Sequence, residues 1–246
     1  MRVCVAGVTG WTGSAVAEAI RAAEDLELVA GVSRSDAASY SSVAEALDAV
    51  SADVLVDYTH AAVVKQNVLA ALERGVAVVV GSSGLTAADY DEIDARARSA
   101  GVGVIAAGNF SVSAALLLRF AREAARHFES WELIDYASAT KPDAPSGTAR
   151  ELAEALGRAR LDVPLEETLG ERAARGASIA GTQVHSLRLP GFSVSTEVVF
   201  AGAGESLTLR QDAGDSAAPY VAGTLLAVRA VEARVGLTRG LDRLLD

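Results

Sequence analysis

The chain has 246 residues, half of them hydrophobic, and a formal net charge of −10. This length allows one large domain or two modest ones. The acidic charge argues against nucleic acid or an anionic membrane as a partner. The single cysteine, Cys4, excludes an intrachain disulfide. Since no signal-peptide pattern is present and no apolar run approaches the ~20 residues of a membrane span, we expect a cytoplasmic protein.

The first predicted strand, residues 2–6, leads into a turn with three evenly spaced glycines. Gly7, Gly10 and Gly13 have the spacing G-x-x-G-x-x-G, and an alanine-rich helix follows them. A strand, a glycine turn and a helix are the context of a dinucleotide fingerprint. Its glycines allow a tight turn, close approach to pyrophosphate, and close packing of helix and strand. Glycine turns also serve packing alone, and the spacing by itself leaves both interpretations open.

The second predicted strand, residues 26–32, ends in Ser33, Arg34 and Ser35. This position is about 20 residues beyond the fingerprint, where an acidic residue would bind the ribose 2′-hydroxyl of NAD. Ser33 cannot do this, whereas the Arg34 guanidinium suits a 2′-phosphate. The sequence therefore favours NADPH as cofactor. NADH stays possible, and an ordinary solvent-exposed arginine is the alternative interpretation.

Strands and helices continue to alternate as far as residue 110. Helices are predicted over 42–50 and 61–73, and from a capping box at Thr86 and Asp89 onward. Strands are predicted over 54–59, 75–80 and 102–108. Such alternation with short connections indicates an α/β fold, a Rossmann-like doubly wound parallel sheet, whose ligands bind beyond the carboxyl ends of the strands. The segments expected along this edge are Gly7–Gly13, Arg34, Gly81–Gly84 and Asn109–Ser111.

The pattern changes after residue 110. The predicted elements are a helix over 112–128, a strand over 131–137, a helix over 148–159, a loop over 162–181, and strands over 182–189, 193–201 and 205–211. Glycine-containing turns join the last three strands, which predicts antiparallel neighbours. A final helix over 217–234 is expected to return to the first domain. We therefore predict one domain of residues 1–110 and 217–246, and a second, α+β domain of residues 111–216.

A rigid loop connects the strand over 131–137 to the next helix. It runs from Lys141 to Thr148 with the sequence KPDAPSGT, and its two prolines and glycine restrict the backbone. Thr148 and Glu151 have capping-box spacing, so the loop is expected to end at a helix N-terminus, which attracts carboxylates. Lys141, one of only two lysines, precedes this loop. The alternative interpretation is an ordinary rigid turn.

Together these segments resemble the dihydrodipicolinate reductase family. The resemblance covers essentially the whole chain in order, and its most specific motif is Asp143–Ala149. It implies a nucleotide-binding domain for residues 1–110 and 217–246, and a mixed-sheet domain for substrate binding and oligomerisation over residues 111–216. It further implies a homotetramer that transfers hydride from a nicotinamide to a cyclic unsaturated imine dicarboxylate, an anionic small molecule of the diaminopimelate and lysine pathway.

The resemblance also implies roles for individual residues. Lys141 is implied to be the catalytic cation or acid, with Ser138, Ser146, Gly147 and Thr148 around the substrate. The implied cofactor-binding residues are Gly7, Val8, Thr9, Gly10, Trp11, Thr12, Gly13, Ser33, Arg34, Gly81, Ser82, Ser83, Ala107, Gly108, Asn109 and Phe110. No metal site is expected, because one cysteine and three distant histidines lack ligand spacing.

The sequence departs from the family pattern at some of these positions. Ala137 and Ser138 stand four and three residues before Lys141, where the family carries histidines. Trp11 stands where an arginine is common, and Ser33 where an acid is common. A divergent member that reduces a different cyclic imine, and an NADP-binding protein without turnover, are therefore alternatives. A short-chain dehydrogenase is disfavoured, because Tyr136 and Lys141 lie five residues apart rather than four.

Overall fold

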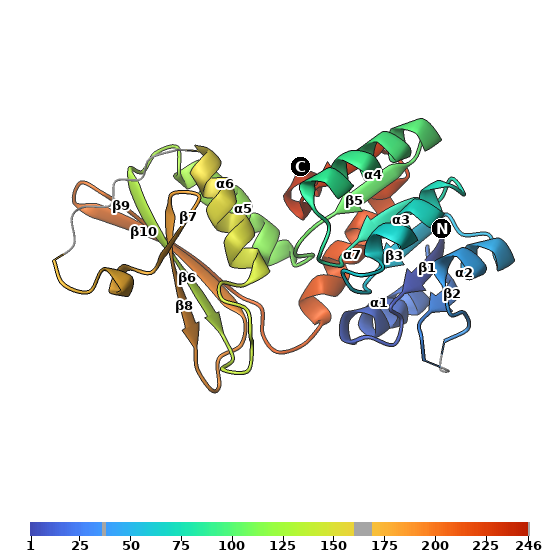
Figure 1. Ribbon diagram of the computed structural model, residues 1–246, viewed down its shortest axis with the longest axis horizontal. Coiled ribbons are helices and arrows are strands. Elements are labelled where there is room, and N and C mark those ends of the chain that lie inside the picture. The colour runs from blue at the N-terminus through green and yellow to red at the C-terminus, as the bar shows by residue number, and fades with distance from the viewer. Residues whose placement is uncertain (36–37, 160–168, 246) are drawn as a thin grey trace. The chain divides into compact units, whose positions relative to one another are not determined.

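The computed structural model describes residues 1–35, 38–159 and 169–245, which form two compact units (Figure 1). Unit 1 comprises Met1–Val112 and Ala217–Asp246, and unit 2 comprises Ser113–Ser216. The first expected boundary, between residues 110 and 111, lies two residues before the one found here, and the second coincides with it. None of the described helices is long and apolar enough to cross a membrane.

Unit 1 is built on a six-stranded sheet in the order β11-β5-β4-β3-β1-β2, and all neighbouring strands are parallel. The strands are β1 (Arg2–Ala6), β2 (Glu27–Val32), β3 (Val54–Asp57), β4 (Ala77–Val80), β5 (Gly103–Ala106) and β11 (Gly236–Arg239). The helices are α1 (Trp11–Ala22), α2 (Val43–Ala49), α3 (Val64–Leu72), α4 (Ala87–Ala100) and α7 (Ala218–Val231), and η2 (Leu241–Leu244) is a 3₁₀ turn. The predicted Rossmann-like parallel sheet is therefore confirmed.

Helices cover both faces of this sheet. α2, α3 and α4 share one core cluster with the strands, whereas α1 and α7 pack together on the other side (Figure 1). Burial on both faces explains why β3, β4 and β5 read as continuous apolar runs. The predicted capping box at α4 is confirmed. Thr86 Oγ1 accepts from Asp89 N at 3.2 Å, and Asp89 Oδ2 accepts from Thr86 N at 2.8 Å.

The sixth strand, β11, was not predicted. The final helix ends at Val231, earlier than the expected residue 234, and the next residues pair with β5. Gly236 N donates to Val102 O and Gly240 N donates to Ala106 O, both at 2.9 Å. Four residues are too few to show a strand periodicity, so only the open edge of β5 defines this element.

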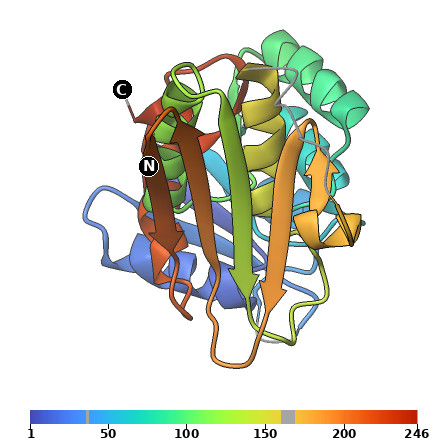
Figure 2. The ribbon, with the colours of Figure 1, turned by 90° about the vertical axis from the view of Figure 1, so that its left-hand side faces the viewer.

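Unit 2 contains a five-stranded mixed sheet in the order β10-β9-β6-β8-β7. The strands are β6 (Ser130–Ala137), β7 (Ala177–Ile179), β8 (Thr182–Arg188), β9 (Ser195–Gly202) and β10 (Glu205–Asp212), and the helices are α5 (Val112–Ala124), α6 (Gly147–Ala159) and the 3₁₀ turn η1 (Arg172–Arg175). α5 and α6 pack on one face of the sheet around Trp131 and Leu133. Figure 2 shows the opposite face of the sheet with none of the described helices of unit 2 in front of it.

Three expectations for unit 2 need correction. First, β8 and β9 are not neighbours, because β6 lies between them, parallel to β8 and antiparallel to β9. β6 takes this central place since every alternate residue of the strand is buried, Asp135 included. Only the predicted antiparallel pairing of β9 with β10 is confirmed. Second, the segment over 162–181 is not simply a loop, because it contains η1 and β7, while residues 162–168 lie outside the described residues.

The third correction concerns the cap of α6. The helix begins at Gly147, one residue before the expected cap at Thr148. Ser146 therefore occupies the position just before the helix, and its Oγ accepts from Ala149 N at 3.2 Å. The capping-box spacing of Thr148 and Glu151 was a misleading match, because a serine two residues earlier reaches the free N–H groups first.

Candidate functional site

The glycine turn after β1 has two of the three properties that its spacing suggested, the tight turn and the close packing. Gly7 has φ +81°, and a Cβ at Gly7 would lie 2.3 Å from Tyr58 O. A Cβ at Gly13 would lie 2.0 Å from Gly7 O, so both glycines are required by packing. Gly10 differs, because it is the N-cap of α1 and no side chain caps that helix, whose first turn also lacks an acidic residue. The positive end of α1 is therefore available to an anion.

The turn and the end of β2 meet directly. Thr9 Oγ1 and Ser33 Oγ are 2.7 Å apart, and Ser35 N donates to Ser33 Oγ at 3.3 Å. Arg34 follows Ser33 on the surface. Trp11 opens α1, is 61% exposed, and contacts the Tyr220 ring edge-on at 5.9 Å between centroids. The structure therefore brings together the residues predicted for the phosphates and the adenosine ribose.

Asp57, at the end of β3, is fully buried and organises the next two loops. Its Oδ1 accepts from Thr59 N at 3.0 Å, from Thr59 Oγ1 at 2.6 Å and from Ser82 Oγ at 2.6 Å. Its Oδ2 accepts from Asn67 Nδ2 at 2.8 Å. Asp57 was not predicted as a site residue. Its signal was an acid at the end of an apolar strand, where a side chain must find hydrogen-bond partners.

The loops after β4 and β5 are held by Tyr58. A Cβ at Gly81 would lie 2.2 Å from the Tyr58 ring, so only glycine fits there. The Tyr58 hydroxyl hydrogen-bonds to Thr224 Oγ1 of α7 at 2.6 Å, and burial raises its pKa well above the ordinary value. Its ring contacts Phe110 edge-on at 6.2 Å. The loop residues at this end are Gly81, Ser82, Ser83, Ala107, Gly108, Asn109 and Phe110.

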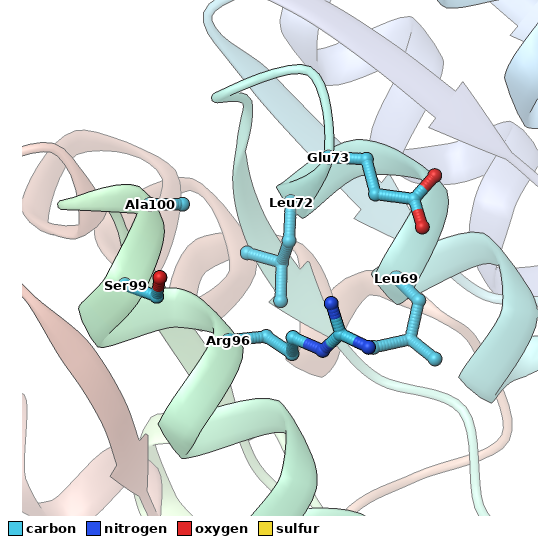
Figure 3. Close-up of a pocket in the computed structure, with 6 residues that line it drawn as sticks. All are labelled: Leu69, Leu72, Glu73, Arg96, Ser99 and Ala100. Atoms are coloured by element: carbon cyan, nitrogen blue, oxygen red, sulfur yellow. The ribbon is translucent and has the colours of Figure 1, made fainter.

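Because the sheet is parallel, these loops all lie at the same edge as the glycine turn. A separate groove lies between α3 and α4, away from this edge, with a volume of about 180 Å³ (Figure 3). Figure 3 shows the Arg96 side chain extending beside Leu69 in this groove. None of the residues that line the groove was predicted to bind cofactor or substrate.

In unit 2, the loop after β6 is held by Asp135 and Arg188. Asp135 is fully buried, and its Oδ2 accepts from Arg188 Nη2 at 2.7 Å, from Ser146 N at 2.8 Å and from Ser186 Oγ at 3.2 Å. Arg188 Nη2 also donates to Asp143 O at 2.8 Å. These bonds hold the loop at Asp143 and at Ser146. Neither Asp135 nor Arg188 was predicted, although Asp135 falls on the buried face of an alternating strand.

Ser146 is more deeply engaged than a surface binding residue would be. It is 3% exposed, and its Oγ donates to Asp135 Oδ1 at 2.8 Å while it accepts from Ala149 N. Its hydroxyl therefore holds the loop against β6. Gly147, which follows, is exposed, and Thr148 is half-buried. No acidic residue lies in the first turn of α6, so this helix N-terminus is also suited to an anion.

Lys141 and Ser138 belong to one turn at the start of this loop. Lys141 N donates to Ser138 O at 3.0 Å, and Ser138 Oγ lies 3.0 Å from Thr140 Oγ1. The Lys141 ammonium forms an ion pair with Asp143 Oδ1 at 2.8 Å. The hydrogen bond from Lys141 lowers the pKa of the Asp143 carboxyl below its ordinary value. Among the described residues, no group of histidine, cysteine and acidic side chains could hold a metal ion.

Unit 1 combines a parallel sheet with a glycine turn before an uncapped helix, and unit 2 has a lysine-bearing loop at a helix N-terminus. These features are typical of two-unit, nicotinamide-dependent oxidoreductases. The family model described as "Dihydrodipicolinate reductase, N-terminus" matches residues 1–110, and "Dihydrodipicolinate reductase, C-terminus" matches residues 113–245. The chain belongs to the dihydrodipicolinate reductase family, and it is therefore an NAD(P)H-dependent oxidoreductase.

Individual relatives match over their full length. The 4-hydroxy-tetrahydrodipicolinate reductase of Nocardia farcinica (strain IFM 10152) is 43% identical over 252 residues, and the match covers 100% of this chain and 99% of the relative. The enzyme of the same name from Mycobacterium sp. (strain KMS) is 40% identical over 250 residues, with the same coverage. The dipicolinate-bound dihydrodipicolinate reductase from Paenisporosarcina sp. TG-14 aligns with a TM-score of 0.89 at 28% identity, covering 100% of this chain and 99% of that one.

Proposed function

We propose that this reductase acts on 4-hydroxy-tetrahydrodipicolinate, or a closely related cyclic imine dicarboxylate, and uses NADPH. The observation that carries the proposal is the loop of unit 2. Asp135 and Arg188 hold it rigidly, with Lys141 at one end and the N-terminus of α6 at the other. Full-length relatives at 40–43% identity bear the name of an enzyme for this substrate.

The residues of unit 1 fit a dinucleotide. The tight turn at Gly7 and the uncapped start of α1 suit a pyrophosphate, and Thr9 and Ser33 bring the ribose end beside it. Arg34 would bind the 2′-phosphate with paired hydrogen bonds. The loops that follow β4 and β5 would line the nicotinamide end. When bound, the cofactor supplies the hydride that reduces the imine ring.

In unit 2, two sources of positive potential would hold the substrate carboxylates. They are the N–H groups of Gly147 and Thr148 at the start of α6, and the Lys141 ammonium. The ammonium has three donors, and Asp143 engages one of them at 2.8 Å. The others remain for the substrate. We assign Ser146 to positioning the loop rather than to substrate contact, because its hydroxyl is already used.

Lys141 is also the proposed proton donor. Loss of the 4-hydroxyl as water gives a conjugated imine ring, hydride addition to this ring leaves an enamine, and one ring carbon then accepts a proton. Within residues 137–142, Lys141 is the only ionisable side chain. A positioned general acid contributes ~10²–10⁴-fold to such a step. Lys141→Ala should therefore abolish turnover while NADPH still binds.

A second candidate function is the reduction of a different cyclic imine. Ala137 and Ser138 occupy the family's histidine positions, and this difference favours a changed substrate. The two positions are not equivalent here. Ala137 is fully buried on the core face of β6, whereas Ser138 is partly exposed in the turn that leads to Lys141. Only position 138 could present a side chain to a substrate beside Lys141.

The test is a turnover assay that follows NADPH absorbance with 4-hydroxy-tetrahydrodipicolinate and a panel of cyclic imines. The variants are Lys141→Ala, Ser138→His and, as the control lysine, Lys65→Ala. Ser138→His should accelerate reduction if 4-hydroxy-tetrahydrodipicolinate is the substrate. Rapid reduction of another imine, with no gain in Ser138→His, would establish the second candidate. Full activity in Lys141→Ala would refute the site, and NADPH binding without any turnover would identify a binding protein.

The choice of NADPH over NADH has its own test. Losing the Arg34 contact should cost ~1.5–3 kcal/mol, which is roughly ten- to a hundred-fold in NADPH affinity. NADH affinity should be unchanged in Arg34→Ala. The control is Arg21→Ala, which removes an exposed arginine from α1. Equal NADPH affinity in the Arg34 variant and the parent would contradict the assignment.

We further propose a homotetramer in the cytoplasm. On the face of the unit 2 sheet opposite α5 and α6, no described helix of this unit lies over the strands (Figure 2). Leu189 and Phe192, in the turn after β8, are 49% and 38% exposed. An uncovered sheet of this kind calls for a partner. Light scattering should report about four times the chain mass of 25.2 kDa. A particle of one chain mass at micromolar concentration would contradict the proposal.

A further inference from the structure

Three arginines of unit 1 line one cavity at the β11 edge of the sheet. Arg234, Arg239 and Arg243 come from the turn before β11, from its end and from η2, and α4 forms the opposite wall. The cavity has a volume of about 590 Å³. This lies within the roughly 300–1,000 Å³ of small-molecule sites. None of the residues that line it belongs to the predicted cofactor set.

Among the described residues, these three guanidiniums have no ion-pair partner. Elsewhere in unit 1, Arg74 and Arg229 pair with carboxylates at 2.8 and 2.7 Å. Within the described part of the chain, Arg234, Arg239 and Arg243 make no ion pair and no side-chain hydrogen bond. Three unpaired cations around one cavity are unexpected in a chain with a net charge of −10. Their mutual repulsion favours an anion between them.

Arg239 is already oriented for such a ligand. Its guanidinium stacks on the Tyr90 ring of α4, 4.1 Å from the centroid. Stacking uses the face of the guanidinium and leaves its N–H edge free to bind an oxyanion with two parallel hydrogen bonds. Part of the conformational entropy that binding would cost has therefore been lost already in the free protein.

Two acidic residues, Asp91 and Asp94, also line the cavity and reduce its positive charge. Asp94 is engaged, because its Oδ1 accepts from Leu237 N at 2.7 Å and its Oδ2 pairs with Arg98 at 2.9 Å. Those bonds lower the pKa of Asp94, which stays ionised but is compensated by Arg98. Asp91 is exposed and opposes an anion. The three arginines still leave the cavity with a positive balance.

We propose that this cavity binds a small polyvalent oxyanion, a phosphate ester or a polycarboxylate. The site is separate from the cofactor edge, which is the edge of the unit 1 sheet where the glycine turn and the loops after β4 and β5 lie. The proposal does not depend on the reaction that the chain catalyses. Charge, cavity size and the stacked Arg239 all favour a compact ligand with at least two negative charges. A monovalent anion would leave most of the arginine charge unneutralised.

The experiment measures binding of pyrophosphate and of citrate by calorimetry at constant ionic strength, with NADPH at saturation to cover the cofactor edge. The two probes distinguish phosphate from carboxylate chemistry. Arg239→Gln and Arg243→Gln should each weaken binding at least tenfold, and Asp91→Asn should strengthen it. Arg239→Lys keeps the charge and should retain part of the affinity. Thermal unfolding of each variant checks that it is folded.

Two control variants locate the bound anion. Arg96→Gln removes an arginine from the same helix, α4, but from the separate groove of Figure 3, and should leave binding unchanged. Lys141→Ala tests whether citrate sits at the unit 2 loop instead, and should also leave binding unchanged. The proposal is overturned if the parent binds neither probe at millimolar concentration. It is equally overturned if Arg239→Gln binds as the parent does, or if Arg96→Gln weakens binding to the same extent.

Discussion

Asp57 in unit 1 and Asp135 in unit 2 are both fully buried near the carboxyl end of a strand, and each holds a loop of the proposed site. They differ in what surrounds them. Every described donor to Asp57 is neutral: the N–H and hydroxyl of Thr59, the hydroxyl of Ser82 and the amide of Asn67. Asp135 instead has a guanidinium, that of Arg188, together with donors from two serines.

This difference predicts how each loop fails. A charge shared among several neutral hydrogen bonds loses only part of its stabilisation when one of them is weakened. A buried ion pair behaves otherwise, because removal of one partner leaves an uncompensated charge in the interior. Arg188 also bonds to Asp143 O, so its loss would release the loop as well. The unit 2 loop should therefore be the more fragile of the two.

The largest effect is expected from Arg188→Leu. The variant leaves the buried Asp135 carboxyl without its cation, which should lower the free energy of unfolding of unit 2 by roughly 3–5 kcal/mol. Trp131 is 2% exposed in the unit 2 core, whereas Trp11 belongs to unit 1. Urea unfolding followed by tryptophan fluorescence in a Trp11→Phe background therefore reports on unit 2 alone.

Two further variants sharpen this measurement. Adding Asp135→Asn to Arg188→Leu removes the buried charge and should recover a large part of the loss. Arg210→Leu is the comparison, because Arg210 is 45% exposed although it pairs with Asp212 at 3.0 Å and with Glu197 at 3.2 Å. An exposed ion pair contributes about 1 kcal/mol or less, so this loss should stay well below that of Arg188→Leu. Equal losses in Arg210→Leu and Arg188→Leu would show that the burial of Asp135 is not what makes unit 2 fragile.

A smaller effect is expected from Asp57→Asn. The substitution keeps the shape of the side chain, and Asn67 can turn its amide so that its oxygen accepts from the new amide. The bonds from Thr59 and Ser82 would then go to a neutral oxygen instead of a charged one. This weakening should lower the free energy of unfolding by about 1.5 kcal/mol. Because these bonds hold the loops of the cofactor edge, NADPH affinity should fall as well. Calorimetry gives both the stability and the dissociation constant.

The matched control is Asp53→Asn, at the opposite end of β3. Asp53 Oδ2 accepts from Arg2 N at 2.6 Å, far along the strand from the cofactor edge. This variant should be destabilised without a change in NADPH affinity. If both variants bind NADPH as the parent does, Asp57 stabilises unit 1 but does not position the cofactor loops.

The same two carboxylates show what the sequence could and could not predict. The parallel sheet and the glycine turn follow from local patterns, because apolar strands, short connections and glycines are neighbours in the chain. Asp57 and Ser82 are 25 residues apart, and Asp135 and Arg188 are 53 apart. The sequence periodicity between the two members of each pair does not link them. The pairing of Asp135 with Arg188 becomes visible only once β6 is known to lie beside β8.

Position also separates predicted from unpredicted site residues. Lys141 and Gly147 lie in a loop whose prolines and glycine mark it in the sequence, so the loop itself could be predicted. The role of Ser146 could not be predicted, because it depends on the hydrogen bond from its hydroxyl to Asp135 on β6. The strand β11 is a similar case. Its four residues become a strand only because the edge of β5 is open to them.

The smallest effect is expected from the ion pair between Lys141 and Asp143. The hydrogen bond from Lys141 lowers the folded-state pKa of Asp143 below its ordinary value of 3.8. A carboxyl with a lowered folded-state pKa contributes stability above the unfolded-state pKa, and this contribution is lost as the pH falls through the folded-state value. The two side chains are 31% and 47% exposed, so solvent screens the pair. It should contribute at most about 1 kcal/mol.

Asp143→Asn should therefore lower the melting temperature slightly at neutral pH and have no effect in strong acid, where the parent carboxyl is also protonated. Added salt should shrink the difference at neutral pH, since screening weakens exposed pairs. Lys141→Met is the partner for a double-mutant cycle, because in its background Asp143→Asn should no longer change the pH dependence. A difference that persists below the folded-state pKa of Asp143 would mean that the effect of the substitution does not come from the ion pair with Lys141.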